Sequence, residues 1–74
     1  MELKTGQRVL FMIYNSKFVC LVYSGLRLLG RLELPREDVT TPVDELKAWL
    51  RQEANKHGLR VEERNGLASS FDIV

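Results

Sequence analysis

The side chains best suited to chemistry are few in this sequence and stand far apart. His57 is the only histidine and Cys20 the only cysteine among 74 residues. A single cysteine cannot form an internal disulfide, and without a CxxC spacing it cannot anchor a cysteine zinc site. His57 falls on the apolar side of a predicted helix, where a capping or packing role is expected. Cys20 falls inside a predicted strand, as a small buried apolar side chain.

Sequence motifs for catalysis or phosphate binding do not occur. The chain has no dinucleotide fingerprint, no P-loop and no HExxH zinc motif. Glu62 and Glu63 are neighbours in a predicted strand, so their carboxylates point to opposite faces and cannot easily share a metal ion. We therefore expect no catalytic residue, no cofactor and no metal site, and a core too small to hold a small-molecule substrate. The sequence predicts a protein that is not an enzyme.

Arginine side chains offer a different chemistry, the binding of phosphate and guanine. We expect Arg27 and Arg31 on one face of a strand, about 13 Å apart, with Arg8 and Lys17 extending a basic rim. The net charge is only +1, but residues 1–36 carry +4 and the remainder −3. Such a split would suit head-to-tail self-association or an asymmetric partner. A nucleic-acid-binding domain that lays a three-stranded sheet on its ligand is the alternative function.

Three apolar segments predict the first part of a sheet. They are short, rich in β-branched and aromatic residues, and bounded by turn residues. Gly30 is expected to mark a bulge or bend in the third strand. A turn at Ser24-Gly25 would pair Tyr23 with Leu26, whereas the register of the first two strands stays open. The expected strands cover residues 8–14, 18–23 and 26–34.

A helix is predicted over residues 42–57 because it has both start and stop signals. Thr41 is expected to be the N-cap, Pro42 the first helical residue, and Asp44 the residue that completes a capping box. Gly58 is expected to adopt the left-handed conformation that ends a helix.

The last sixteen residues predict a second hairpin. Apolar and polar residues alternate before and after Asn65-Gly66, a strong turn signal. A three-residue loop over 64–66 would pair Leu59 with Phe71 and Val61 with Ser69, which places apolar residues on a common face. The fold class is therefore α+β: a small antiparallel sheet, in the chain order strand, strand, strand, helix, strand, strand, packed on one helix. Residues 1–74 form a single domain.

The first two strands are apolar on both faces, which a sheet with one wet face should not be. We expect Val19, Leu21 and Tyr23 to lie under the helix and the opposite face to lack cover. The second hairpin, a second copy of the chain or another protein would have to cover it. Phe18→Asp or Val22→Asp would then dissociate an assembly without unfolding the chain. Including Trp49 as a partner anchor, the predicted interface residues are Phe11, Phe18, Cys20, Val22, Leu29 and Trp49.

These observations together predict a class of function but no particular partner. No apolar run reaches the roughly 18 residues that span a bilayer, and the first residues lack the pattern of a signal peptide. We expect a cytoplasmic protein with no membrane contact. The predicted function is a protein–protein interaction or regulatory module, an adaptor or inhibitor, that forms a homodimer or binds another protein.

Overall fold

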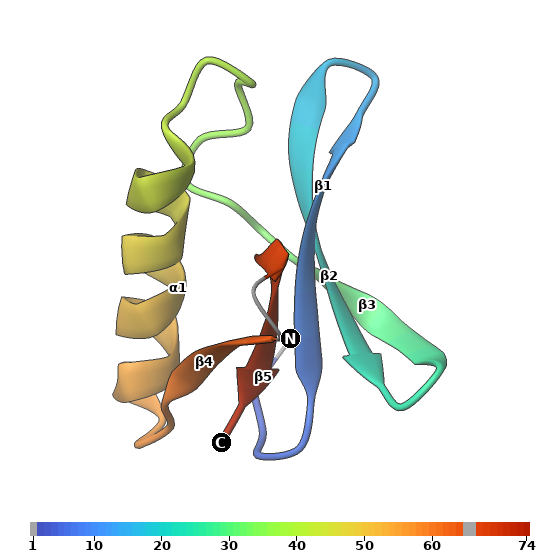
Figure 1. Cartoon of the computed structure of the whole chain (residues 1–74), viewed down its shortest axis with the longest axis vertical. Helices are drawn as coiled ribbons and strands as arrows, with labels where there is room; N and C mark the ends of the chain where they lie inside the picture. Colours follow the sequence, from blue (N-terminus) through green and yellow to red (C-terminus); the bar gives the residue numbers. More distant parts are fainter. Residues whose placement is uncertain (1, 65–66) are drawn as a thin grey trace.

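The computed structural model describes residues 2–64 and 67–74. Its elements form one antiparallel sheet in the order β3-β2-β1-β5-β4, with one helix between β3 and β4. Figure 1 shows α1 lying along one side of this sheet. The predicted α+β class and the order of the elements along the chain are confirmed. The elements are β1 (Arg8–Tyr14), β2 (Lys17–Ser24), β3 (Arg27–Leu32), α1 (Val43–Lys56), β4 (Val61–Arg64) and β5 (Leu67–Ile73).

The turn between β1 and β2 fixes the register that the sequence leaves open. Asn15 and Ser16 both have positive φ angles, 51° and 60°, and Tyr14 pairs with Lys17 on either side of them. Positive φ at both central residues is the requirement of the two-residue turn whose twist matches that of antiparallel strands. The hairpin therefore pairs its strands without a bulge, from Tyr14 and Lys17 to Arg8 and Tyr23.

A bulge interrupts the pairing of β2 with β3, as Gly30 predicts. Tyr23 pairs with Leu28, but the next residue of β2, Val22, pairs with Gly30, so Leu29 is the extra residue. The predicted pairing of Tyr23 with Leu26 is wrong, because the turn lies one residue later, at Gly25-Leu26. One extra residue exchanges the two faces of the strand beyond it.

The helix begins one residue later and ends one residue earlier than predicted, with Gly58 in the predicted left-handed conformation. Pro42, not Thr41, is the N-cap, and no side chain caps the helix N-terminus. At the other end the Gly58 N–H donates to the Asn55 carbonyl (3.0 Å) and the Leu59 N–H to the Ala54 carbonyl (2.9 Å). With Gly58 at φ +71°, these two bonds form the Schellman motif, which satisfies carbonyls that the helix leaves free.

The second hairpin is real, but its predicted register is wrong. Val61 pairs with Ile73 and Glu63 with Phe71, so β5 is shifted by four residues from the expected pairing. A register shift between Glu63 and Arg64 accommodates this displacement, and the predicted loop includes 65–66, which lie outside the described residues. Because four is an even number, the residues of each strand keep their predicted face.

The core lies between α1 and one face of the sheet, which we call the inner face. Leu46, Leu50 and Ala54 of α1 are buried against it, whereas His57, predicted to share their stripe, is exposed. The prediction that the β2 residues of this face lack internal cover is wrong, because α1 lies over this face rather than over the other. The inner-face side chains of the core are Val9, Phe11, Phe18, Cys20, Val22, Phe71 and Ile73.

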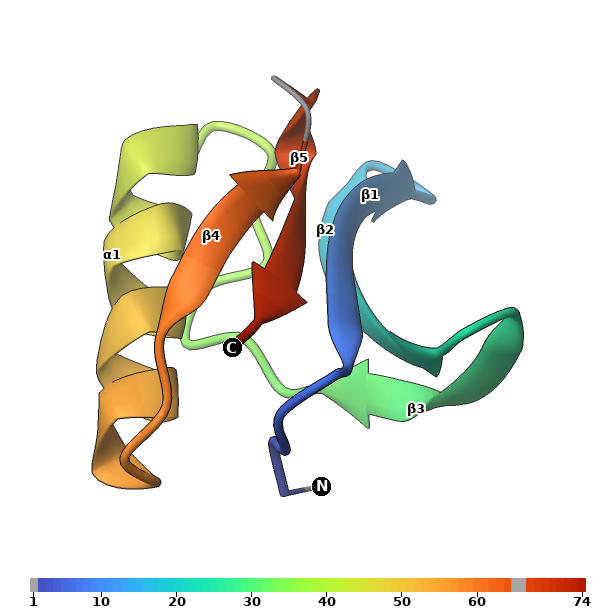
Figure 2. The ribbon, with the colours of Figure 1, turned by 60° about the horizontal axis from the view of Figure 1, so that its bottom comes forward.

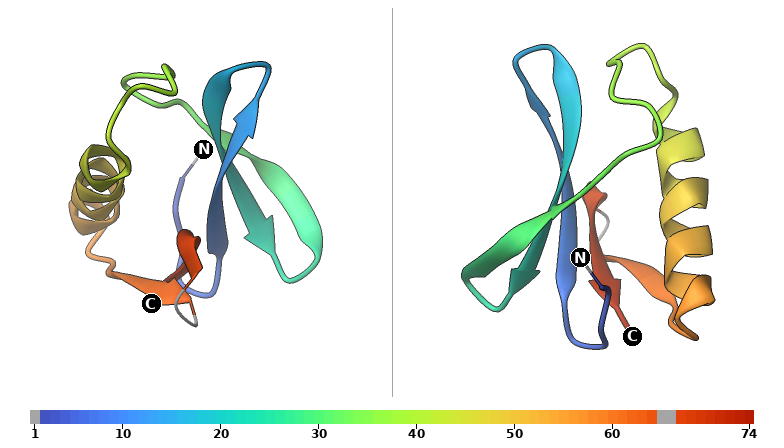
Figure 3. Two further views of the ribbon diagram at one scale, coloured as in Figure 1. Left: turned by 45° about the horizontal axis from the view of Figure 1, so that its top comes forward. Right: turned by 180° about the vertical axis from the view of Figure 1, so that it is seen from behind.

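A connecting segment over residues 33–42 joins β3 to α1 across one edge of the sheet. The Phe18 N–H donates to the Glu37 carbonyl (2.7 Å), and Leu34 is buried in the core. The right-hand view of Figure 3 shows this light-green segment crossing from β3 to the helix. Figure 2 shows that the hairpin of β2 and β3 turns away from α1. The β2–β3 turn therefore projects from the body of the molecule.

Candidate functional site

The second face of the sheet, the outer face, carries an apolar surface that no element of the described chain covers. Its residues are fixed by strand pairing: Leu10 pairs with Leu21, and Met12 with Val19. Tyr23 is flanked by Arg8 on β1 and by Leu28 on β3. The seven apolar or aromatic residues that define the outer face are Leu10, Met12, Tyr14, Val19, Leu21, Tyr23 and Leu28.

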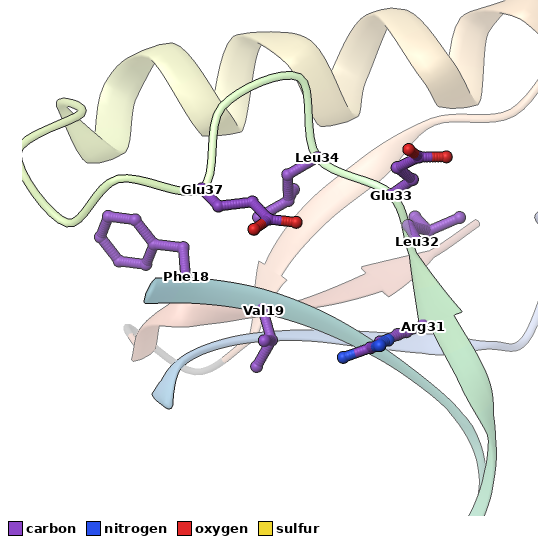
Figure 4. A pocket seen from close by; sticks show the side chains of 7 residues that line it. All are labelled: Phe18, Val19, Arg31, Leu32, Glu33, Leu34 and Glu37. Atoms are coloured by element: carbon purple, nitrogen blue, oxygen red, sulfur yellow. The ribbon is translucent and has the colours of Figure 1, made fainter. Parts of the chain in front are cut away.

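Exposure separates the outer face from the inner face although both are apolar. Met12 is 44% exposed and Leu28 52%, whereas Val22, next to two outer-face residues in the chain, is 0% exposed. Figure 4 shows the division at one place on β2, where Phe18 points to the helix side and Val19 to the other. A hollow of about 200 Å³ lies in the outer face, lined by Met12, Tyr14, Val19, Leu21 and Arg31.

Arg31 is the charged group at this hollow. It pairs with Leu21 and so stands on the outer face, and Figure 4 shows it reaching from β3 toward Val19. It belongs to none of the ion pairs that residues 2–64 and 67–74 form. A second hollow of about 320 Å³ lies beside it, between β2, β3 and the connecting segment, with Glu33 and Glu37 among its lining residues.

The outer face carries charges of both signs at its borders. Arg31 and Lys17 stand on the β3 and β2 side, where Lys17 lies 3.7 Å from a Glu37 carboxylate oxygen. Asp72 and Glu62 pair with each other on the β5 and β4 side, where Asp72 lies 3.8 Å from Arg64 and is also the strand neighbour of Arg8. Arg31 is therefore a cation outside every ion pair of the described residues, and Asp72 is a carboxylate on the opposite border.

The four basic residues predicted to bind nucleic acid do not form one surface. Arg8, Lys17 and Arg31 lie on the outer face, but Arg27 pairs with Ser24 on the opposite side of the sheet. The prediction that Arg27 and Arg31 share a face is wrong, because the extra residue Leu29 lies between them in the strand.

Four of the six predicted interface residues are buried, and the other two are at least partly exposed. Phe11, Phe18, Cys20 and Val22 are inner-face core residues, so the face assigned to them in the sequence analysis is wrong. Leu29 is 37% exposed in the bulge of β3. Trp49 is half-buried on α1 and packs against the edge of the core, beside the connecting segment. The residues of the outer face are predicted to lie under the helix. The bulge at Gly30, which exchanges the two faces of β3 beyond it, is the signal that reverses this assignment.

The residues with the strongest intrinsic chemistry are separated in the structure. Cys20 is fully buried, and burial raises the pKa of its thiol to about 12, which removes the thiolate that nucleophilic or metal chemistry needs. His57 is the exposed C-cap residue of α1. Residues 2–64 and 67–74 contain no cluster of three His, Cys, Asp or Glu side chains placed to hold a metal ion. Within those ranges no helix is both long and apolar enough to cross a membrane.

Comparison with known proteins gives no relative: no family model, curated protein or solved structure matches the chain.

Proposed function

We propose that the protein is a non-enzymatic protein-binding module whose contact surface is the outer face. The observation that carries this proposal is the block of seven apolar or aromatic side chains in adjacent positions on three strands. A contiguous apolar surface of this kind marks an interaction site in soluble proteins, and an interface core is depleted of charge with a polar rim. The outer face has both properties.

A second copy of the chain is the proposed occupant, because the charges of the outer face are self-complementary. A two-fold axis in the interface, parallel to β1 and β2, lays β2 of one copy over β1 of the other and β3 over β5. Arg31 of each copy then comes near Asp72 of its partner, while the apolar centres face each other. Aligned packing of two sheets in this way is the arrangement of a β-sandwich.

A matched pair of substitutions on β1 tests this proposal. Met12 and Ile13 are neighbours, 44% and 61% exposed, and point to opposite sides of the strand. Both positions tolerate a charge in the folded chain because both are exposed. In sedimentation velocity at micromolar concentration, we expect the wild-type protein and Ile13→Asp to form the outer-face dimer and Met12→Asp to be monomeric. A monomeric wild type, or equal behaviour of the two variants, would refute the proposed contact.

Nucleic-acid binding is the second candidate, favoured by one arrangement on the outer face. Two tyrosine–cation pairs face each other across β1 and β2, Tyr14 with Lys17 and Tyr23 with Arg8. Aromatic and basic side chains in alternation suit the bases and phosphates of a single strand. Titration with single-stranded DNA and RNA at two salt concentrations tests this, because contacts to phosphate weaken steeply with salt.

A cytoplasmic location is part of the proposal. Its support is the lone cysteine, a pattern usual in a reducing compartment.

A further inference from the structure

The turn between β2 and β3 carries the most exposed large apolar side chain of the described residues. Leu26 is 97% exposed. It follows Gly25, whose φ of +60° allows the tight turn, and it precedes the exposed Arg27. Both views of Figure 3 show this hairpin extending away from α1. The projecting turn, here the β2–β3 tip, thus presents an apolar side chain next to a cation.

A groove with the opposite character lies beside Trp49, between α1 and the connecting segment. Two hollows of about 270 and 400 Å³ both have Pro35 and Trp49 in their walls. Thr41 lines the first, is only 3% exposed, and has a hydroxyl without a hydrogen-bond partner among the described residues. A buried hydroxyl without a partner is rare in native proteins. We call this feature, with Pro35, Thr41 and Trp49 as its walls, the Trp49 groove.

The rim of the Trp49 groove carries charges of both signs, and at the smaller hollow Arg36 and Glu45 form an ion pair (3.6 Å). Glu33 and Glu53 line the larger hollow. The Lys56 amine donates to the Glu53 carboxylate (2.7 Å), whereas Glu33 takes part in no ion pair formed within residues 2–64 and 67–74. An apolar floor with a free carboxylate at its edge suits an apolar side chain followed by a cation, which is the order found in the β2–β3 tip.

The tip and the groove cannot meet within one chain. They stand at opposite ends of β3, which starts at Arg27, directly after Leu26, and ends at Leu32, directly before Glu33. Six residues of strand span about 20 Å. A tip can therefore fill a Trp49 groove only on another molecule.

We propose that the β2–β3 tip of one copy binds the Trp49 groove of a second copy, with Leu26 against Trp49 and Pro35 and Arg27 paired with Glu33. The contact joins two different surfaces. In a pair, one molecule therefore keeps a free groove and the other a free tip, so the contact can repeat head to tail. It does not involve the outer face, so it would link outer-face dimers into larger assemblies.

Met12→Asp is the background in which this contact is tested, because it separates the contact from outer-face dimerisation. Trp49 is the only tryptophan, so its emission during dilution reports occupancy of the groove directly. We expect the emission of the Met12→Asp protein to depend on concentration, with a blue shift on association. Addition of Leu26→Asp should weaken association by roughly thirtyfold or more, the effect of losing a central interface side chain.

Charge reversal keeps the test independent of folding, because Arg27 and Glu33 are both exposed. Arg27→Glu alone and Glu33→Arg alone should each be defective, but an equimolar mixture of the two should associate, as should the double variant. Recovery of association in the mixture is expected only if Arg27 of one molecule pairs with Glu33 of another.

Two results would overturn the proposal: emission independent of concentration, or association unaffected by Leu26→Asp. Failure of the outer-face proposal is distinguishable, since Met12→Asp would then sediment like the wild type whatever the tip variants do.

Discussion

The inner and outer faces of β1 and β2 are built from the same kinds of residue, but the inner face is buried and the outer face is largely exposed. Val9 and Phe11 are buried, whereas their neighbours on the other side of β1, Leu10 and Met12, are half-buried and exposed. The faces differ in what lies over them: the inner face has α1, Leu34 and Leu3, and the outer face has no such cover. Apolar character makes a face able to be buried, but the position of the single helix decides which face becomes core.

The strongest test of this difference places the same charge on neighbouring residues of β2. Val22→Asp should abolish cooperative folding, because a buried carboxylate without a partner costs several kcal/mol, against a total stability of about 5–15 kcal/mol. Leu21→Asp should keep the native far-UV circular dichroism spectrum. The sequence analysis expects Val22→Asp only to dissociate an assembly. A cooperative thermal transition in Val22→Asp would restore that expectation and remove Val22 from the core.

Truncation of one core leucine and one outer-face leucine to alanine compares how much each side contributes to the free energy of unfolding. Leu50 is 0% exposed on α1, so Leu50→Ala should lower the free energy of unfolding by about 2–5 kcal/mol. Leu28 is half exposed on the outer face, so Leu28→Ala should change it by about 0.5 kcal/mol or less. Urea denaturation of the monomeric Met12→Asp protein measures both. Equal losses would mean that the outer face is covered within the chain.

The smallest effect concerns the ion pair that ties α1 to β4 on the inner side. The Lys47 amine donates to Glu63 (2.7 Å), and this hydrogen bond with its charge lowers the pKa of the Glu63 carboxyl from its ordinary 4.5. A lowered folded-state pKa means stability that is present above pH 4.5 and lost as the pH falls through the folded value.

Glu63→Gln should therefore destabilise the protein slightly near pH 6, and this deficit should shrink as the pH falls below 4.5. Glu62→Gln, on the opposite side of β4, is the control and should not show this pattern. Thermal midpoints measured across this pH range decide the matter. A Glu63→Gln deficit that persists at low pH would assign the effect to packing rather than to charge.

Local signals in the sequence predict the elements well, because each is decided by a few neighbouring residues. Gly58 predicts the end of α1 and Gly30 predicts the bulge in β3, and both features are found. The N-cap prediction at Thr41 is wrong because Asp38 organises the preceding turn instead, accepting the Thr40 N–H (2.9 Å) and, through its carbonyl, the Thr41 N–H (2.9 Å).

The choice of buried face could not be predicted from β1 and β2 themselves, because both strands are apolar on both sides and alternation then carries no information. That choice depends on how the strand continues past Leu29 and on where the connecting segment brings α1. Both are long-range properties. The site prediction consequently named Phe11 on β1 and Phe18, Cys20 and Val22 on β2, which are core residues, instead of their neighbours on the exposed face.

The buried Cys20 thiol can report how the inner face opens. Thiol reagents attack the thiolate, and in the folded chain this thiol keeps its proton until about pH 12. Because Cys20 is also fully buried, an alkylating reagent at neutral pH reaches it when the sheet opens, and Cys20 is the only thiol to modify. The labelling rate gives the opening rate where the reagent reacts faster than the sheet recloses, and otherwise the equilibrium population of opened molecules, under native conditions and without denaturant.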